Sequence, residues 1–421
     1  MRTLRMAAFT IAALLATGCG GSSKSVTTVA PGLPTTSPAS PSNNYLGTQS
    51  PGLWSLQLDH TQNAFSYKPT TYPSSGALAS GNFTASNGFL NLGLTSAGAS
   101  AGYAVEMQGE AAWLRPGDST ASPVLSVQQG GCFAIGGYVT FQFVAVPGQY
   151  SVYTPGALGY GSIVASTSAD GKSWTFGNQV QYASPYVGGA GAGTPPKGAG
   201  SGGYVTNFSA TCTETNGTSI ITAPANNIVS MPTSFAISPA GFFLADESVV
   251  PLSQTALPPY SLVGVVEPST PLSTTDVASH SYSGFLYQTG GLGNESTSPV
   301  AFAPAAATTG ALAGGVYPND DATQTAASNM VLTLGKQDAQ MNGLYTGATI
   351  TEPDPQQACA QNGFGIAGTD AQGNATCTLD AVAIVGNPNG EYAIFVIAFD
   401  ATQQISTSLK RTGMGIYLYQ Q

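Results

Sequence analysis

Short stretches in which apolar and polar residues alternate recur along the chain. Leu53 to Asp59 reads LWSLQLD, and Gly81 to Leu94 reads GNFTASNGFLNLGL. Alternation with a period of two is typical of a strand that is buried on one face. Asn87 and Gly88 interrupt the second stretch with the pair that favours a two-residue hairpin turn, because both tolerate a positive φ. Similar patterns predict further strands within 138–146, 162–176, 215–222, 330–335, 391–400 and 415–421.

No stretch after the first eighteen residues keeps a helical period, so the sequence predicts an all-β fold. We expect antiparallel hairpins and meanders that form one or two barrel-like or sandwich units. A weak similarity between two pairs of segments suggests two units. Segment 241–246 precedes 262–268 much as 393–400 precedes 415–421, and each pair reads as two closing strands joined by a long loop. The units then cover 45–268 and 269–421, with the boundary in the Pro, Ser and Thr stretch after Pro268.

Two local resemblances bear on the fold. Gly52 to Asp59, GLWSLQLD, resembles the G-x-W opening strand of lipocalin-like and avidin-like barrels. Ser168 to Trp174, SADGKSW, resembles a shortened form of the Asp-box turn of sialidase-type propellers, although it departs from that pattern by one residue and occurs once. A six-bladed β-propeller is therefore the alternative fold, because roughly two dozen candidate strands suit blades of four strands each.

The composition is typical of an exported protein rich in strands and turns. Only 7% of the 421 residues are charged, 42% are hydrophobic, and the chain contains 53 Gly and 28 Pro. The 17 Phe and 19 Tyr supply the apolar surface that disordered chains lack. The chain is therefore expected to fold around one large core or two smaller ones.

The N-terminal residues have the order of a secretory signal. Arg2 and Arg5 are followed by a short apolar segment, Ala7 to Ala16, and by small residues before Cys19. The run LLATGC resembles the lipobox of bacterial lipoproteins, in which the cysteine is lipidated and becomes the first residue of the mature chain. It departs from the commonest form in having Ala16 where Leu is usual. The resemblance implies that residues 1–18 are a signal peptide and that lipid on Cys19 anchors an exported protein to the cell envelope.

Two features of the residues after the cysteine refine this expectation. Gly20 stands where lipoproteins kept in the inner membrane often carry Asp, so the outer membrane is favoured if the host has two membranes. Residues 19–44 have no hydrophobic period and contain four prolines at intervals, which predicts a disordered Gly, Ser, Thr and Pro tether. The whole chain also resembles, loosely, the Gly, Ser and Thr-rich β lipoproteins of bacterial envelopes.

The charge balance argues against nucleic-acid binding. The chain has 10 basic and 20 acidic residues, and removal of the signal peptide takes away Arg2 and Arg5 but no acid. A mature chain with a net charge of about −12 repels phosphate backbones and anionic headgroups. No basic run interleaved with aromatic residues occurs in the sequence.

Four cysteines follow Cys19, and an even count in an exported chain predicts two disulfides. Four cysteines allow three connectivities, and pairing the nearest in sequence joins Cys132 to Cys212 and Cys359 to Cys377. Zinc is the weaker interpretation, because there is no CxxC spacing and the chain has only two histidines.

Catalytic motifs are scarce. There is no G-x-S-x-G elbow, P-loop or dinucleotide fingerprint, and both histidines, His60 and His280, lie in segments that read as solvated turns or strand edges. A glycosidase needs only two carboxylates, so that chemistry stays open. Its candidate acids are Asp59, Glu106, Glu110, Asp246, Asp320, Asp321, Asp338 and Asp380.

A polar turn is the favoured interpretation of YPNDDATQT, and Asn319, Asp320 and Asp321 within it are weak candidates for a Ca²⁺ site. No cofactor is expected.

These patterns favour a noncatalytic envelope lipoprotein that acts as a structural or binding scaffold. Its partners are expected to be the membrane, through the lipid anchor, and envelope glycans or proteins. Trp54, Trp113 and Trp174 are the weak candidates for stacking on sugars, although packing in a core is the commoner role of tryptophan. The alternatives are a carbohydrate-active hydrolase on a propeller and a lipocalin-like carrier that holds an apolar ligand inside a barrel.

Overall fold

The computed structural model describes most of the chain after residue 41. The described ranges are 42–48, 53–69, 79–94, 100–107, 109–117, 123–147, 159–183, 202–205, 207–215, 218–223, 234–246, 260–289, 295–306, 308–355, 357, 359, 365–399 and 413–421.

The first closed sheet, barrel 1, is an eight-stranded antiparallel meander in which β8 pairs back onto β1. Each strand pairs with the next one along the chain, which is the arrangement that short hairpin connections produce. Its strands are β1 (Ser42–Thr48), β2 (Leu53–Asp59), β3 (Ala64–Pro69), β4 (Ala79–Ser86), β5 (Phe89–Leu94), β6 (Ser100–Met107), β7 (Ala111–Pro116) and β8 (Val124–Gln128).

Barrel 2 follows the same plan. β17 pairs with β9, and β10 pairs with β11, so the sheet closes, while β12 pairs with the later part of β11, beyond the part that pairs with β13. Its strands are β9 (Val139–Pro147), β10 (Gly159–Thr167), β11 (Ser173–Ala183), β12 (Gly202–Val205), β13 (Phe208–Thr215), β14 (Thr218–Thr222), β15 (Ser234–Ile237), β16 (Phe242–Asp246) and β17 (Tyr260–Val266).

Barrel 3 is closed by β26 pairing with β18 and by β22 pairing with β24, and β23 is an added edge strand on β24. Its strands are β18 (Tyr282–Thr289), β19 (Glu295–Pro304), β20 (Ala311–Val316), β21 (Met330–Thr333), β22 (Leu344–Pro353), β23 (Ile366–Thr369), β24 (Ala375–Gly386), β25 (Ala393–Phe399) and β26 (Gly413–Gln420). The short helix α1 (Thr274–Val277) precedes it, and the turns η1 (Pro318–Asp320) and η2 (Pro388–Gly390) connect its strands.

The interior of each barrel is filled by side chains from alternate strand positions. In β4 the residues that point inward are buried and their neighbours are exposed, as a period of two requires. Barrel 2 contains a stack of aromatic rings, with centroids 4.6 Å apart for Phe176 and Phe235 and 5.8 Å apart for Trp174 and Phe176. These packed interiors form three separate apolar clusters, one in each barrel.

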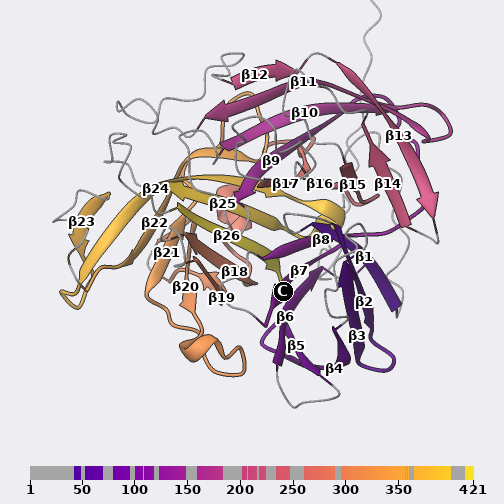
Figure 1. Cartoon of the computed structure of the whole chain (residues 1–421). Helices are drawn as coiled ribbons and strands as arrows, with labels where there is room; N and C mark the ends of the chain where they lie inside the picture. The colour runs from indigo at the N-terminus through magenta and orange to yellow at the C-terminus, as the bar shows by residue number, and fades with distance from the viewer. Residues whose placement is uncertain are drawn as a thin grey trace, which may run out of the picture.

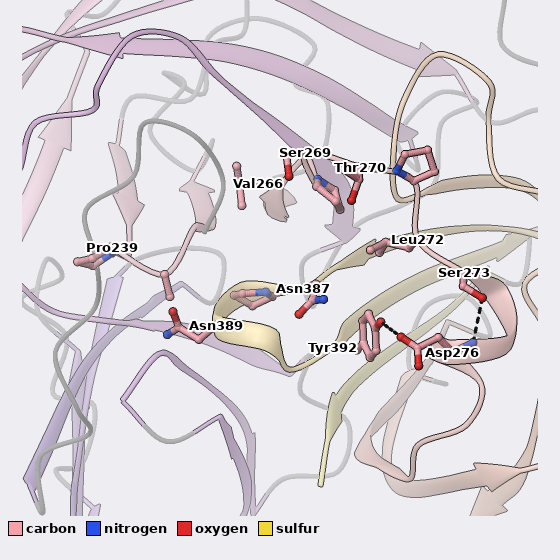
Figure 2. Close-up of a pocket in the computed structure, with 14 residues that line it drawn as sticks. Pro239, Val266, Ser269, Thr270, Leu272, Ser273, Asp276, Asn387, Asn389 and Tyr392 are labelled. Carbon is pink, nitrogen blue, oxygen red and sulfur yellow. Dashed lines mark hydrogen bonds between the residues drawn. The ribbon is translucent and has the colours of Figure 1, made fainter. Parts of the chain in front are cut away.

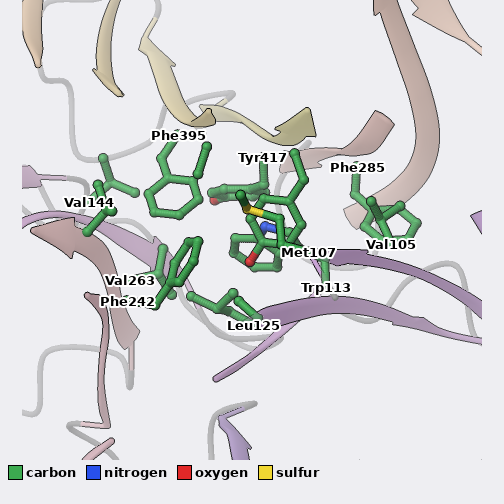
Figure 3. Close-up of a cluster of buried hydrophobic side chains, with 14 of the residues drawn as sticks. Val105, Met107, Trp113, Leu125, Val144, Phe242, Val263, Phe285, Phe395 and Tyr417 are labelled. Carbon is green, nitrogen blue, oxygen red and sulfur yellow. The ribbon is translucent and has the colours of Figure 1, made fainter. Parts of the chain in front are cut away.

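A fourth apolar cluster, here called the shared core, joins the outer faces of all three barrels (Figure 3). Trp113 of barrel 1 lies 4.5 Å from the ring of Tyr417 and 5.9 Å from that of Phe395, both in barrel 3. Phe242 of barrel 2 lies 5.7 Å from Tyr419 of barrel 3. Figure 1 shows the three barrels side by side, with the strands that carry these residues in the middle. The barrels are therefore packed together as one body.

The linkers that lead into barrels 2 and 3 close one end of each barrel. Ile135 is buried in the interior cluster of barrel 2, and its backbone N–H donates to the Thr167 hydroxyl at 2.7 Å. Before barrel 3, Val277 of α1 is buried in the interior cluster of that barrel. The Tyr282 hydroxyl donates to the Val277 carbonyl at 2.6 Å. Each linker thus contributes apolar side chains to the barrel that it precedes.

Polar contacts also join barrels 1 and 3. The buried Arg115 guanidinium lies 3.1 Å from the Asp320 carboxylate. Asn87 and Gly88 have φ values of 51° and 80°, as the predicted hairpin turn requires. The Asn87 side-chain amide donates to the Ala322 and Gln324 carbonyls at 2.9 and 3.0 Å. The predicted turn therefore also serves as an inter-barrel contact.

The structure confirms the all-β, barrel-like prediction and excludes the propeller, because the sheets close into barrels. The described residues form three barrels, whereas one or two units are expected from the sequence. The span 45–268 contains barrels 1 and 2, and 269–421 contains barrel 3, while β1 already begins at Ser42, inside the predicted tether. The two pairs of similar segments correspond to β16 with β17 and to β25 with β26. In each pair the two strands are hydrogen-bonded to one another and are the last strands of their barrel in the chain.

Both predicted disulfides form with the nearest-neighbour pairing. Cys132 is bonded to Cys212 and Cys359 to Cys377, with Cα atoms 5.9 and 5.6 Å apart. We expect intact-mass measurements after alkylation to find these four thiols only when the purified protein has first been reduced. Four cysteines that are alkylated without reductant would contradict this pairing.

Candidate functional site

Cys19, the signal peptide and most of the tether lie outside the described residues, so the lipidation site stays a prediction. Within the described ranges, no helix is long and apolar enough to cross a membrane.

The three tryptophans proposed for sugar stacking do not form an exposed aromatic platform. Trp113 and Trp174 are buried, at 0% and 1% exposure, and the Trp174 indole N–H donates to the Gly171 carbonyl at 3.0 Å. Trp54 is half-buried, with its ring 5.9 Å from that of Tyr67. The glycan-stacking hypothesis is therefore wrong for Trp113 and Trp174, because their ring faces are covered by other side chains.

The candidate Ca²⁺ ligands are used in other contacts. Asp320 pairs with Arg115. Asp321 accepts hydrogen bonds from the Thr323 hydroxyl at 2.7 Å and the Gln324 side-chain amide at 3.0 Å, which lower the pKa of its carboxyl. Asn319 is exposed at a positive φ of 55°. Among the described residues, no group of three or more His, Cys, Asp or Glu side chains could hold a metal ion. The segment is thus a polar turn that joins barrel 3 to barrel 1.

The acids considered for a glycosidase are spread over the three barrels. Asp59 accepts from the backbone N–H groups of Thr61 and Gln62 at 2.9 and 3.1 Å, and Asp338 does the same in the turn that follows it. Asp380 is half-buried on β24, and the side chain of Asp246 lies outside the described residues. Asp59 and Asp338 therefore stabilise turns.

A hydrogen-bonded cluster fills the end of barrel 1 at which β1 begins. The Tyr45 hydroxyl donates to one Glu106 oxygen, and a ring nitrogen of His60 lies 2.7 Å from the other. The Gly109 backbone N–H donates to the Tyr45 hydroxyl at 3.2 Å. Burial, followed by the Glu106 charge, raises the pKa of Tyr45 well above its usual value. His60 is in a turn, as expected, but its ring packs inward against Phe83 rather than being fully solvated.

The described structure contains a pocket of about 280 Å³ between barrel 2, the linker and barrel 3 (Figure 2). One wall is the β15–β16 turn at Pro239, a second is the linker with Pro268 and Leu272, and a third is η2 with Tyr392 beside it. Asp276 is the acidic residue among those that line it, and its Oδ2 accepts from the Tyr392 hydroxyl at 2.5 Å. Its position between units makes this pocket the candidate binding site.

A buried glutamate of barrel 1 lies directly behind the η2 wall. Glu110, at 6% exposure, accepts a hydrogen bond from the Asn389 side-chain amide through Oε1. Its Oε2 has no hydrogen-bond partner among the described residues. Burial first, and then the charge of Glu391, raise the pKa of Glu110 to about 7, although the Asn389 bond opposes the shift. Glu110 thus connects the barrel 1–barrel 3 contact to the pocket wall.

Sequence reasoning missed the pocket and the role of Asn389. The Pro388-Asn389-Gly390 run is a recognisable turn signal, and Asn389 adopts a positive φ of 49° there. The sequence does not indicate that this turn would meet Glu110, which is 279 positions earlier in the chain.

No protein-family model matches the chain, and no curated protein matches it. Among solved structures, it is similar to a double mutant of transferrin binding protein B from Haemophilus parasuis, with 8% identity and a TM-score of 0.24 over 91% of this chain and 76% of that one. It is also similar to transferrin binding protein B from Neisseria meningitidis, with 11% identity and a TM-score of 0.26 over 88% of this chain and 66% of that one. At these values the likeness carries no argument about function.

Proposed function

We propose that this chain is an exported, lipid-anchored protein of the bacterial cell envelope that binds a protein partner and is not an enzyme. The outer membrane is its location if the host has two membranes. The tether holds the three barrels away from the lipid headgroups.

One observation carries the binding part of this proposal. The barrel interiors are occupied by their own packed side chains, and the barrels are joined through the shared core. A lipocalin-like carrier needs an apolar lumen, and the filled interiors argue against that alternative. A rigid body of this kind offers its outer surface to a partner without a large ordering cost.

A protein partner is favoured over a glycan because two of the three tryptophans are covered. Exposed aromatic faces are what stack on sugar rings, and the described part of the chain has only Tyr138 and Ile366 as strongly exposed large apolar side chains.

The anchoring part of the proposal rests on the sequence before and around Cys19. We expect Cys19→Ser to prevent lipidation, and therefore to release the protein from the membrane fraction or to block its maturation. Cell fractionation with immunoblotting measures this change, and mass spectrometry of the mature N-terminus shows whether acyl chains are present.

Gly20→Asp is the matched control. It leaves the cysteine in place, so the variant is expected to stay membrane-bound while moving from the outer to the inner membrane in a host with two. A Cys19→Ser chain that matures normally and still sediments with membranes would rule out the lipid anchor.

A further inference from the structure

The pocket between barrels 2 and 3 has walls that are fixed before any ligand arrives. The Leu272 backbone N–H donates to Gln337 Oε1 at 3.0 Å, and the Tyr345 hydroxyl donates to the Leu272 carbonyl at 3.2 Å. The Asn342 side-chain amide donates to the Pro268 carbonyl at 2.9 Å. Prolines also occupy four lining positions, which limits backbone freedom. Such a site loses little entropy on binding.

The charge of the pocket is negative. Asp276 is an exposed lining residue, and no Lys, Arg or His is among the described residues that line the pocket. Glu267 and Glu391 lie on the same linker and turn segments that form two of its walls. The whole chain adds a net charge of −10. A field of this sign attracts cationic groups and repels anionic ones.

The polar groups at the pocket also suit a ligand that donates hydrogen bonds. Asp276 accepts from the Tyr392 hydroxyl through Oδ2, and its side chain is exposed to solvent. Figure 2 shows Tyr392 beside the Asp276 carboxylate, with Leu272 above them in the view. An exposed carboxylate that a neighbouring hydroxyl holds in place suits an ammonium or guanidinium group, which can donate charge-assisted hydrogen bonds to it.

The size and lining suit a single long side chain. A volume of about 280 Å³ lies just below the range of sites for drug-sized molecules, roughly 300 to 1,000 Å³. Val266 and Leu272, together with the prolines, provide apolar surface for a methylene stem, while the charged head meets Asp276.

We propose that this pocket binds a lysine or arginine side chain of a partner protein, with Asp276 as the counter-charge and the Tyr392 hydroxyl holding that carboxylate in place. The identification of the occupant as a protein side chain rests on the proposed binding function, whereas the preference for a cation rests on the pocket itself. A basic surface on the partner then docks on the barrel 2–barrel 3 junction.

The test uses the purified full chain with methyl-labelled Leu and Val, and amino-acid probes blocked at both ends. N-acetyl-arginine methylamide and N-acetyl-lysine methylamide are expected to shift the methyl signals of Leu272 and Val266 saturably, with millimolar dissociation constants. Asp276→Asn keeps an oxygen that accepts from Tyr392 but removes the charge, and it is expected to weaken binding at least tenfold. Asp370→Asn, which removes the same charge from an exposed turn of barrel 3, is the matched control and should leave binding unchanged.

The proposal fails if neither probe shifts these signals, if Asp276→Asn binds as well as the unaltered chain, or if N-acetyl-glutamate methylamide binds equally. Putrescine that binds more tightly than both cationic probes would instead assign the pocket to a free diamine and overturn the side-chain occupant. None of these outcomes depends on Cys19, so a failure of the pocket and a failure of the lipid anchor are distinguished.

Discussion

Raising the pH from 5 to 8 is expected to lower the free energy of unfolding by about 2 to 3 kcal/mol through one side chain, Glu110. Its pKa rises from an ordinary value of 4.5 to about 7 in the folded protein, chiefly because it is buried between barrels 1 and 3. Each unit of difference corresponds to about 1.4 kcal/mol.

The sign follows from which state holds the proton. Below about pH 4.5 Glu110 is protonated in both states, and its contribution to stability is fully present. As the pH rises, the unfolded chain loses this proton first, so the folded state is progressively disfavoured until the pH exceeds the folded pKa. Burial, and then the charge of Asp354, also raise the pKa of Glu352 to about 7, and burial raises the pKa of Glu391. Both residues therefore add to the loss of stability as the pH rises.

Glu110→Gln isolates the contribution of this residue. The glutamine oxygen can still accept from the Asn389 amide, but the side chain cannot ionise. Urea unfolding at pH 5 and at pH 8 gives the stability that is lost between the two pH values. For Glu110→Gln this loss is expected to be smaller than for the unaltered protein by about 2 to 3 kcal/mol. Glu214→Gln on the exposed face of β13 is the matched control and should keep the full loss. Parallel pH profiles for Glu110→Gln and the unaltered protein would contradict the prediction.

Much of the strand pattern could be predicted from the sequence, because exposed strands alternate visibly. The number of barrels could not, and β25 shows why. The strand itself is predicted, but its apolar run AIFVIAF does not tell what covers each face: Ile394 and Val396 face the interior of barrel 3, while Phe395 and Ile397 face the shared core. A strand that is buried on both faces reads as a continuous apolar stretch. Such runs are the signal that the outer face of a barrel is covered by another unit.

The candidate site was less predictable than the fold. The disulfides followed from pairing the nearest cysteines, which requires no knowledge of the topology. The pocket requires three segments to meet, and their approach is set by the packing of whole barrels. Asp276 reads as an ordinary residue in a polar stretch, and only its contact with Tyr392, 116 positions later, distinguishes it.

Replacing Trp113 with Ala is expected to destabilise the protein by about 3 to 5 kcal/mol, the usual cost of removing a buried large aromatic side chain. Trp113 is fully buried, and it contacts Phe395, Tyr417 and Tyr419 across the boundary between barrels 1 and 3. The packing that is lost should therefore be that of the shared core and not that of one barrel interior.

Trp174→Ala provides the comparison, because Trp174 is equally buried but lies inside barrel 2, where its ring contacts Phe176 and Phe133. Tyr419→Phe is the mild control in the shared core. The Tyr419 hydroxyl has no hydrogen-bond partner among the described residues, so its removal should cost little. Urea unfolding measures the size of each effect, and hydrogen exchange locates it.

The two tryptophan variants should differ in where exchange increases. For Trp113→Ala we expect faster exchange in β26 and in β16, which belong to different barrels and meet through Tyr419 and Phe242. For Trp174→Ala we expect the increase in β11 and β13, which are paired strands of barrel 2. If Trp113→Ala costs less than about 1 kcal/mol, or if its faster exchange is confined to barrel 1, the shared core does not hold the barrels together. A loss of the expected size that spreads to β26 and β16 would show that the three barrels stabilise one another, because local openings spread only through contacts that are energetically coupled.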